Sequence, residues 1–265
     1  MEQPILQVEH LTKFFSVGPH AEVHAVDDVN FTLRRGRTFG LVGESGCGKS
    51  SCARTIIRIY EPSQGKIIFN GQDIAHLKPR QMQPVRRNMQ MIFQDPMTSL
   101  DPVFKIGKQM TEMIMAHQNV TKDEAWKMAV EALSKVGIPE PEKRMNSYPY
   151  ELSGGMCQRV IIAMAVCCKP KLIIADEPTT ALDVTVQAQV LELLKELQRD
   201  MDTAILLITH NLGVVWEMCD KVMVMYAGNT VEFTDTKTLY SNPRHPYTWG
   251  LLDSMPKLSD ESKGE

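Results

Sequence analysis

The feature that most constrains this chain is the octapeptide at residues 43–50, GESGCGKS, which has the form G-x-x-x-x-G-K-[ST]. An apolar run precedes it and a helical pattern follows it, which is the strand–loop–helix order that the motif requires. Glycines allow a tight turn whose backbone N–H groups face an anion, and the following helix directs the positive end of its dipole there. The sequence therefore predicts a cradle for nucleotide phosphates made of Gly43, Glu44, Ser45, Gly46, Cys47, Gly48, Lys49, Ser50 and Ser51.

Two side chains of this loop carry specific chemistry. Lys49 is placed to reach the β- and γ-phosphates, and the Ser50 hydroxyl is placed to bind Mg²⁺. The alternative is a glycine-rich turn that binds nothing. We disfavour it, because the motif arrives here with both its strand and its helix.

A second apolar run, at 171–175, ends in two acids, Asp176 and Glu177. A continuous apolar run of this kind is typical of a central parallel strand, whose carboxyl end would lie at the same sheet edge as the phosphate loop. We expect Asp176 to hold Mg²⁺ through water, and Glu177 to orient or deprotonate a water aimed at the γ-phosphate. The alternative, a strand capped by two solvated acids, would make this common edge a coincidence.

Two more apolar runs end in polar residues that could join this site. Gln94 follows the strand predicted at 89–93, and His210 follows the strand predicted at 203–209. A lone histidine is more often structural than catalytic, but its place at the end of a third central strand favours a catalytic role.

Two further features are ambiguous on the residues alone. Ser153, Gly154 and Gly155 precede an apolar helix, and an ordinary N-terminal cap explains them as well as an anion site does. Phe14 or Phe15, at the end of a lead-in strand, could stack on an adenine ring or pack in the core.

The remaining patterns outline the other elements. They predict an antiparallel lead-in at residues 5–33, a helical insertion at 106–136, a long helix at 184–199, a closing hairpin at 221–233, a short helix that starts within 242–247 and a polar tail at 257–265. With 265 residues, 43% of them hydrophobic, the chain can bury a large core.

Composition also limits the partners. A net charge of −3 gives no general attraction to nucleic acid, so we expect no nucleic-acid partner. The six cysteines contain no C-x-x-C pair, which favours a reducing cytosol. No segment approaches the ~18 apolar residues of a membrane span, and the N-terminus lacks the pattern of a signal peptide.

Taken together, these motifs resemble the ordered set of the ABC-transporter ATPases, and the resemblance covers nearly the whole chain. Four shorter segments resemble the oligopeptide/dipeptide/nickel importer branch of this family. They lie at 93–96, 147–152, 183–189 and 243–248 and read FQDP, SYPYEL, DVTVQAQ and PRHPYT.

The resemblance implies an α/β P-loop NTPase fold with a mixed central sheet, an antiparallel β subdomain and a helical subdomain. The ATPase domain would span 1–240, with the helical subdomain at about 98–165, followed by a short extension at 241–265. Relatives often continue into a cysteine-rich tail that binds an iron–sulfur cluster. The sequence leaves open whether such a tail is naturally absent or has been removed.

The resemblance also implies a mechanism. Two ATPase subunits, identical or paralogous, would close head to tail, with ATP and Mg²⁺ between the phosphate loop of one and Ser153, Gly154 and Gly155 of the other. Phe15 rather than Phe14 would stack on adenine, Asp183 would communicate across the dimer, and Gln94 would link Mg²⁺ and water to the membrane subunits. The catalytic set would be Lys49, Gln94, Glu177 and His210, and the metal set Ser50, Gln94 and Asp176.

Such a subunit would lie peripherally on the cytoplasmic face of the membrane and bind two permease subunits. An extracytoplasmic solute-binding protein would be an indirect partner. Peptides are the expected cargo, with nickel or oligosaccharides as alternatives. A soluble ABC ATPase of DNA repair or translation would carry a long coiled-coil insertion or a second ATPase unit, which this sequence lacks. A non-hydrolysing subunit usually replaces residues equivalent to Glu177 or His210, and both are present.

Overall fold

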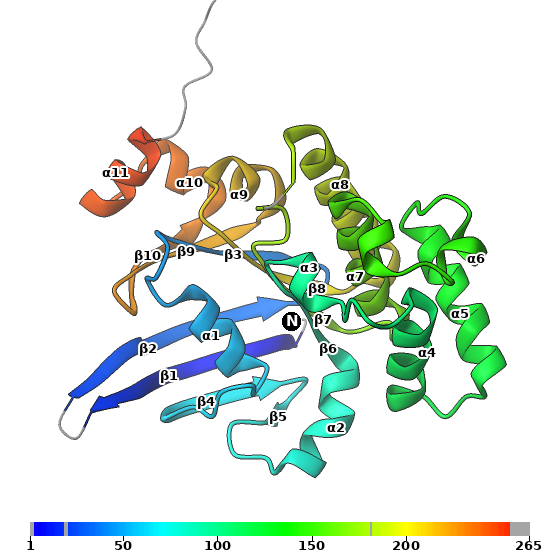
Figure 1. The fold of residues 1–265 in the computed structure, drawn as a ribbon. Coiled ribbons are helices and arrows are strands. Elements are labelled where there is room, and N and C mark those ends of the chain that lie inside the picture. The colour runs from blue at the N-terminus through cyan, green and yellow to red at the C-terminus, as the bar shows by residue number, and fades with distance from the viewer. Residues whose placement is uncertain (1–2, 19–20, 181, 255–265) are drawn as a thin grey trace, which may run out of the picture.

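The computed structural model describes residues 3–18, 21–180 and 182–254. Its central sheet has the strand order β10-β9-β3-β8-β7-β6, in which all neighbours pair in parallel except β10 and β9 (Figure 1). The strands are β3 (Thr38–Val42), β6 (Met89–Ile92), β7 (Leu172–Asp176), β8 (Ala204–Thr209), β9 (Lys221–Tyr226) and β10 (Asn229–Asp235). The mixed central sheet and the closing hairpin are therefore confirmed.

The antiparallel subdomain is a second sheet, of order β2-β1-β4-β5. Its strands are β1 (Pro4–Gly18), β2 (Ala21–Arg34), β4 (Gln64–Phe69) and β5 (Gln72–Asp73). Phe14 and Phe15 were expected at the end of a lead-in strand, but β1 continues to Gly18 and pairs Phe15 with Val23. The pairing register shifts between Val8 and Leu11, where His10 has a positive φ of 51°. This irregularity interrupts the period-two pattern and hides the continuity of the strand.

The helices of the structure lie around these sheets. They are α1 (Lys49–Ile56), α2 (Pro79–Asn88), α3 (Pro96–Ser99), α4 (Ile106–His117), α5 (Lys122–Lys135), α6 (Pro141–Arg144), the 3-10 turn η1 (Pro149–Glu151), α7 (Gly154–Cys167), α8 (Val184–Met201), α9 (Leu212–Met218), α10 (Thr236–Ser241) and α11 (Pro246–Asp253).

The helical insertion predicted at 106–136 contains two helices, α4 and α5, because Thr121 starts α5. Its backbone N–H donates to Glu124 Oε2 at 2.8 Å and its hydroxyl accepts from the Glu124 N–H at 3.3 Å, which is a capping box. Helix α2 was not predicted, because Pro84 lies inside it and proline normally ends a helical pattern.

Each face of the central sheet is covered by its own apolar core. Ile173 of β7 packs with the core that contains side chains of α4, α5, α7, α8 and α9. The next residue, Ile174, packs with the core shared with α1 and the antiparallel sheet. Both are fully buried, which explains why the run at 172–175 is continuously apolar instead of alternating.

Strand register brings four strand ends together. Val42 at the end of β3 pairs with Thr209 of β8, Asp176 of β7 pairs with Ile208, and Ile92 of β6 pairs with Ala175. The residues that follow β3, β6, β7 and β8 therefore share one edge of the sheet, as the sequence predicts.

No helix among the described residues combines the length and apolarity that crossing a bilayer would require. The polar tail predicted at 257–265 lies outside the described residues, as does Ala181 in the stretch at 180–183.

Candidate functional site

The loop between β3 and α1 holds a shape that glycine alone fits. Gly43 and Gly48 have positive φ values of 151° and 110°. A Cβ atom would lie 2.3 Å from the Met225 carbonyl oxygen at Gly43 and 2.1 Å from the Ala25 carbonyl oxygen at Gly48. The loop is therefore wedged between β2 and β9, while Gly46, with nothing within 4 Å of such a Cβ, leaves its concave side open.

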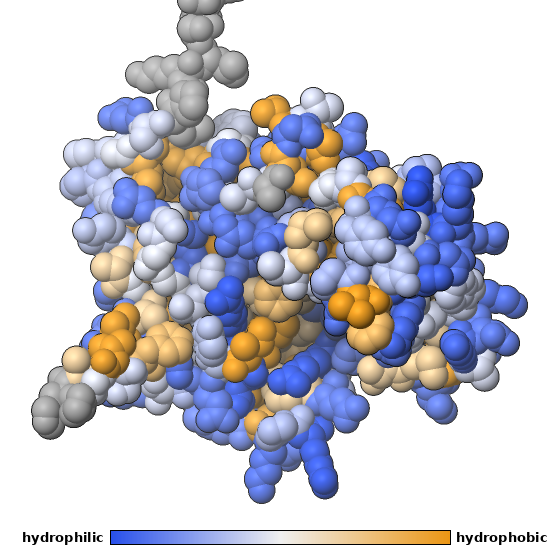
Figure 2. Space-filling model, in the orientation of Figure 1, coloured by the Kyte–Doolittle hydropathy of each residue, from blue (hydrophilic) through white to orange (hydrophobic). Residues whose placement is uncertain are grey.

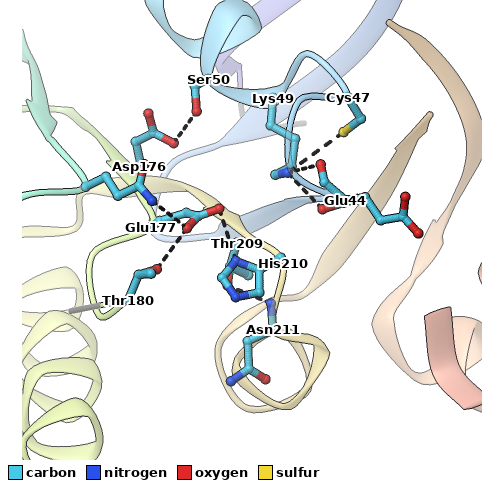
Figure 3. A network of polar contacts seen from close by, with 12 residues as sticks. Glu44, Cys47, Lys49, Ser50, Asp176, Glu177, Thr180, Thr209, His210 and Asn211 are labelled. Carbon is cyan, nitrogen blue, oxygen red and sulfur yellow. Dashed lines mark hydrogen bonds and ion pairs between the residues drawn. The ribbon is translucent and has the colours of Figure 1, made fainter. Parts of the chain in front are cut away.

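Lys49 folds back over this loop (Figure 3). Its ammonium donates hydrogen bonds to the carbonyl oxygens of Gly43 at 2.8 Å and Glu44 at 2.7 Å. The Cys47 Sγ lies 3.8 Å from the same ammonium, but burial raises the pKa of this thiol, so Cys47 is neutral in the loop. The positive charge of Lys49 is thus fixed at the mouth of the cradle.

Ser50 and Asp176 meet between α1 and β7. The Ser50 hydroxyl donates to Asp176 Oδ1 at 2.9 Å, while Asp176 Oδ2 is buried without a hydrogen-bond partner. Burial raises the pKa of Asp176, and the hydrogen bond from Ser50 opposes that shift.

An unpartnered buried carboxylate oxygen beside a hydroxyl fits Mg²⁺. This ion takes oxygen ligands, and at phosphate sites it uses one or two protein groups plus the phosphates themselves. The described residues contain no group of three or more His, Cys, Asp or Glu side chains arranged as a metal cage. Ser50 and Asp176 therefore suit a metal that arrives with its nucleotide.

Glu177 is the centre of a hydrogen-bonded cluster at the sheet edge (Figure 3). It follows β7 in the left-handed region, with φ 47°, an uncommon conformation for a non-glycine residue. Its Oε2 accepts from Gln94 Nε2 at 3.1 Å and from the Thr180 hydroxyl at 2.9 Å. Its Oε1 lies 3.1 Å from His210 Nδ1. The carboxylate is therefore held in one orientation from three sides.

Gln94 and Glu177 share a cavity of about 140 Å³ with residues of the loop and of α1, which are Ser45, Gly46, Gly48, Lys49, Ser50 and Ser51. A neighbouring cavity of about 430 Å³ includes Phe15 together with Cys47 and Ser51 of the loop. Phe14 does not line it, and its ring lies 4.1 Å from that of His24. Of the two aromatic candidates, Phe15 is therefore the one beside the loop.

The other predicted residues lie elsewhere. Ser153, Gly154, Gly155 and Asp183 line neither of these cavities. Ser153 caps α7 by accepting from the Met156 N–H at 3.3 Å, and Asp183 caps α8 by accepting from the Val186 N–H at 2.9 Å.

Gly155 lets these two helix starts approach each other. A Cβ at this position would lie 2.7 Å from Val186 Cγ1. The N-termini of α7 and α8 therefore lie next to each other, away from the residues that line the two cavities at the loop.

Sequence reasoning gave no role to two residues that touch the site. Thr180 donates to Glu177, as described above, and the Tyr247 hydroxyl of α11 accepts from the Glu44 N–H at 3.0 Å. The Tyr247 ring also packs on Tyr226 of β9, with centroids 4.7 Å apart. Tyr247 belongs to the PRHPYT segment, but no local pattern reveals a contact between residues 203 positions apart.

The comparisons with known proteins agree with this geometry. The ABC transporter family profile matches residues 26–180, and the profile of the oligopeptide/dipeptide transporter C-terminal region matches residues 231–265. The oligopeptide transport ATP-binding protein OppD of Bacillus subtilis is 54% identical over 92% of this chain and 69% of its own length. OppD of Salmonella typhimurium is 50% identical over 97% of this chain and 78% of its own length.

Solved structures share the fold. The structure of cbiO1 from Clostridium perfringens, part of the ABC transporter complex cbiONQ, superposes with a TM-score of 0.79 at 29% identity, covering 91% of this chain and 92% of that one. A dimeric ATP-binding cassette in a post-hydrolysis state bound to ADP and Pi gives a TM-score of 0.78 at 25% identity, covering 87% and 98%. The chain therefore belongs to the ABC transporter ATPases, enzymes that bind and hydrolyse ATP, and within them to the oligopeptide/dipeptide transporter branch.

Proposed function

We propose that this chain is the ATP-hydrolysing motor subunit of a membrane importer for peptides. The observation that carries the proposal is the similarity of nearly the whole chain to subunits named for peptide transport. The OppD proteins and the dipeptide transport protein DppD of Bacillus subtilis are 46–54% identical over 92–97% of this chain. Peptides are therefore favoured over nickel or oligosaccharides as the cargo.

The cradle residues would bind the nucleotide and Lys49 would neutralise its phosphate charge. Positioning and charge stabilisation account for most of the catalysis of phosphoryl transfer. A fixed ammonium and aligned backbone N–H groups would supply both. Ser50 and Asp176 would hold Mg²⁺, which supplies further charge neutralisation when bound. Phe15 would stack on the adenine ring from the adjoining cavity.

Glu177 would orient or deprotonate the attacking water. Its carboxylate borders the cavity that also contains Lys49 and Ser50, so it faces the position of the terminal phosphate. The hydrogen bonds to Gln94 and His210 would keep the carboxylate aimed at this water. Gln94 would also link Mg²⁺ and the attacking water to the membrane subunits.

The N-termini of α7 and α8 would complete the nucleotide site of a second ATPase subunit. That subunit is a second copy of this chain or a paralogue. In a head-to-tail dimer, Ser153, Gly154 and Gly155 at the α7 N-terminus would meet the phosphates held by the partner, and Asp183 would lie at the same seam. The dimeric cassette among the similar structures supports this arrangement.

The helical side would dock two permease subunits. Apolar side chains there are exposed, Val103 at 72%, Met97 at 49% and Phe104 at 40%, and the face seen in Figure 2 carries separate apolar patches among polar residues.

The ATPase domain at 1–240, its helical subdomain at 98–165 and the extension at 241–265 remain our proposed division of the chain. The subunit would then lie on the cytoplasmic face of the membrane.

Mixing two inactive variants tests the shared site. Lys49→Ala disables the cradle, and Ser153→Glu places a negative charge where we expect the partner's phosphate. A mixed dimer contains one site with both defects and one intact site, so hydrolysis should return on mixing. Dimers that form with ATP and show no recovery would contradict the shared site, while a chain that stays monomeric with ATP would assign the pairing to a paralogue.

Isolation from membranes tests the transport role. The tagged chain should co-purify with two permease subunits, and a peptide added to the reconstituted complex with its solute-binding protein should stimulate ATP hydrolysis. Stimulation by nickel or an oligosaccharide but not by peptides would overturn the proposed cargo. Recovery of the chain without any membrane subunit would overturn the motor role.

A further inference from the structure

Three sulfur atoms from two helices meet far from the nucleotide cradle, at the opposite end of α7 from Ser153. Cys167 is the last residue of α7, Cys168 follows it, and Met113 projects from α4. The Cys167 and Cys168 Sγ atoms are 4.0 Å apart, and the Met113 Sδ lies 3.9 Å from the first and 4.0 Å from the second. The three sulfurs therefore form a nearly equilateral triangle.

The size of this triangle matches a metal site. The centre of a triangle with these sides lies about 2.3 Å from each corner, which is the length of a metal–thiolate bond. A single ion in the plane of the sulfurs could thus bond to all three without displacement of the helices.

The ligand types select the ion. Two thiolates and a thioether are soft ligands, which favour Cu(I) and disfavour hard cations such as Mg²⁺ or Ca²⁺. Zn²⁺ sites almost always have four ligands, and the described residues include no group of three or more His, Cys, Asp or Glu side chains that could hold a metal.

The surroundings favour a thiolate at Cys168, whereas its hydrogen bond to Cys168 and burial raise the pKa of Cys167, so a bound ion has to displace the proton of that thiol. Hydrogen bonding from the Cys167 thiol lowers the pKa of Cys168 against the opposing effect of burial, and the nearby Gln118 and Arg87 act in the same direction. Gln118 Nε2 lies 3.9 Å from the Cys168 Sγ, where it can support a bound thiolate. Cys168 is buried, whereas Cys167 and Met113 are only partly buried, so the triangle can be reached from solvent.

We infer that Met113, Cys167 and Cys168 form a three-coordinate binding site for a soft monovalent cation, with Cu(I) as the natural occupant. Binding would replace thiol protons, which pass to solvent, and it would change no oxidation state. Because α4 and α7 pack against each other through this contact, the ion would clamp the C-terminal ends of the two helices together.

Competitive titration of the full chain tests the site. The reduced protein, kept free of oxygen, is titrated with Cu(I) against a chromogenic Cu(I) chelator, and redox-inert Ag(I) serves as a second probe. We expect one tightly held equivalent that is lost in Cys167→Ser and in Cys168→Ser. Met113→Leu, which conserves volume, should keep both thiolates and weaken binding by at least tenfold.

X-ray absorption at the copper edge gives a readout of the ligand set. The wild-type protein should show three sulfur scatterers and Met113→Leu only two. Cys219→Ala is the matched control, because Cys219 is a buried cysteine of another helix end and its loss should leave the tight equivalent unchanged. Far-UV circular dichroism of each variant confirms that it is folded before titration, and Cys168→Ala replaces any serine variant that is not.

Several results would overturn the inference. These are equal binding by the wild-type protein and the Cys167→Ser/Cys168→Ser double variant, a copper site with nitrogen or oxygen ligands, and preference for Zn²⁺ over Cu(I). A Cys167–Cys168 disulfide that forms under the same reducing conditions would also overturn it, since the sulfurs would then approach to about 2.05 Å and cease to be ligands.

Discussion

Two helix N-termini of this molecule look alike in sequence but differ in what faces them. Both α1 and α7 begin after glycine or serine residues, and both direct a positive dipole end outward. The start of α1 adjoins Asp176, Glu177 and Gln94 within the same chain, whereas the start of α7 lines none of the cavities at the loop. The first helix end thus has acidic and amide side chains of its own chain beside it, and the second is the end that we propose to bind the phosphates held by a partner chain.

The largest expected effect would come from Glu177→Gln, which probes the end that is assembled within one chain. Glutamine conserves the shape of the side chain but cannot accept a proton from water, so ATP binding should persist. Turnover should fall by roughly two or more orders of magnitude, the range for loss of a positioned base. Steady-state hydrolysis and equilibrium ATP binding measure the two effects separately.

The control for this variant is Glu131→Gln on the exposed side of α5, which should hydrolyse ATP at the parental rate. Parental activity in Glu177→Gln itself would show that another group activates the water. The site at α1 would then lack the role that separates it from the start of α7.

Ser153→Ala should have the next largest effect and probes the end that needs a partner. A hydrogen bond to a charged group contributes about 1.5–3 kcal/mol, so its loss should slow hydrolysis roughly tenfold or more. ATP binding to the isolated chain should be unchanged, because Ser153 lines neither cavity at the loop. Hydrolysis rates in the dimer and ATP affinity of the monomer check both statements.

Thr121→Ala is the matched control, since Thr121 also caps a helix through its hydroxyl but has no proposed nucleotide contact. Both variants should lose about 1 kcal/mol of folding stability with the cap. Hydrolysis that falls equally in both would reduce Ser153 to an ordinary cap.

This contrast also separates what the sequence could predict from what it could not. The cradle, the acids after β7 and His210 follow apolar runs, and adjacent parallel strands bring such endings to one edge, so their convergence could be predicted. The strands of the central sheet could be predicted for the same reason, because continuous apolar runs mark them. The residues around Ser153 left a helix cap and an anion site both open, and their nucleotide role rested on family resemblance, because a partner chain leaves no periodicity in the sequence.

Other features escaped prediction because they depend on tertiary packing. The hydroxyl of Tyr247 reaches Glu44 from α11, and Glu232 anchors the residues before this helix by accepting from the backbone N–H groups of Arg244 at 2.9 Å and His245 at 3.1 Å. The left-handed backbone of Glu177 and the proline inside α2 contradict local preferences that a sequence reading has to assume.

Asp176→Asn should reveal the energetic cost of building the first site. The folded-state pKa of Asp176 is raised, so between the unfolded value of about 3.8 and the folded value the native state binds more protons than the unfolded state. This residue's contribution to stability therefore falls as pH rises through that window. Relative to Asp176→Asn, the nucleotide-free wild-type protein should therefore lose stability as pH rises through this window.

Urea unfolding of both proteins at a series of pH values measures this difference. Asp200→Asn serves as the control, because it removes a carboxylate from an exposed position instead of a buried one. A difference between wild type and Asp176→Asn that grows with pH would mean that the carboxylate stabilises the empty site.

The smallest effect is expected for Tyr247→Phe, which tests whether the first site also depends on the C-terminal helix. The substitution removes the acceptor of the Glu44 N–H bond and keeps the ring packed on Tyr226, so only one hydrogen bond is lost. Such a bond contributes about 0.5–1.5 kcal/mol, and for a chain of this size Tm should fall by about 2 °C per kcal/mol. Thermal unfolding without nucleotide checks this value, with the exposed Tyr150→Phe as the control.

Because the bond restrains the first residues of the cradle, ATP affinity should also weaken in Tyr247→Phe but not in Tyr150→Phe. An unchanged Tm and affinity would show that the loop holds its shape through Gly43 and Gly48 alone, without help from α11.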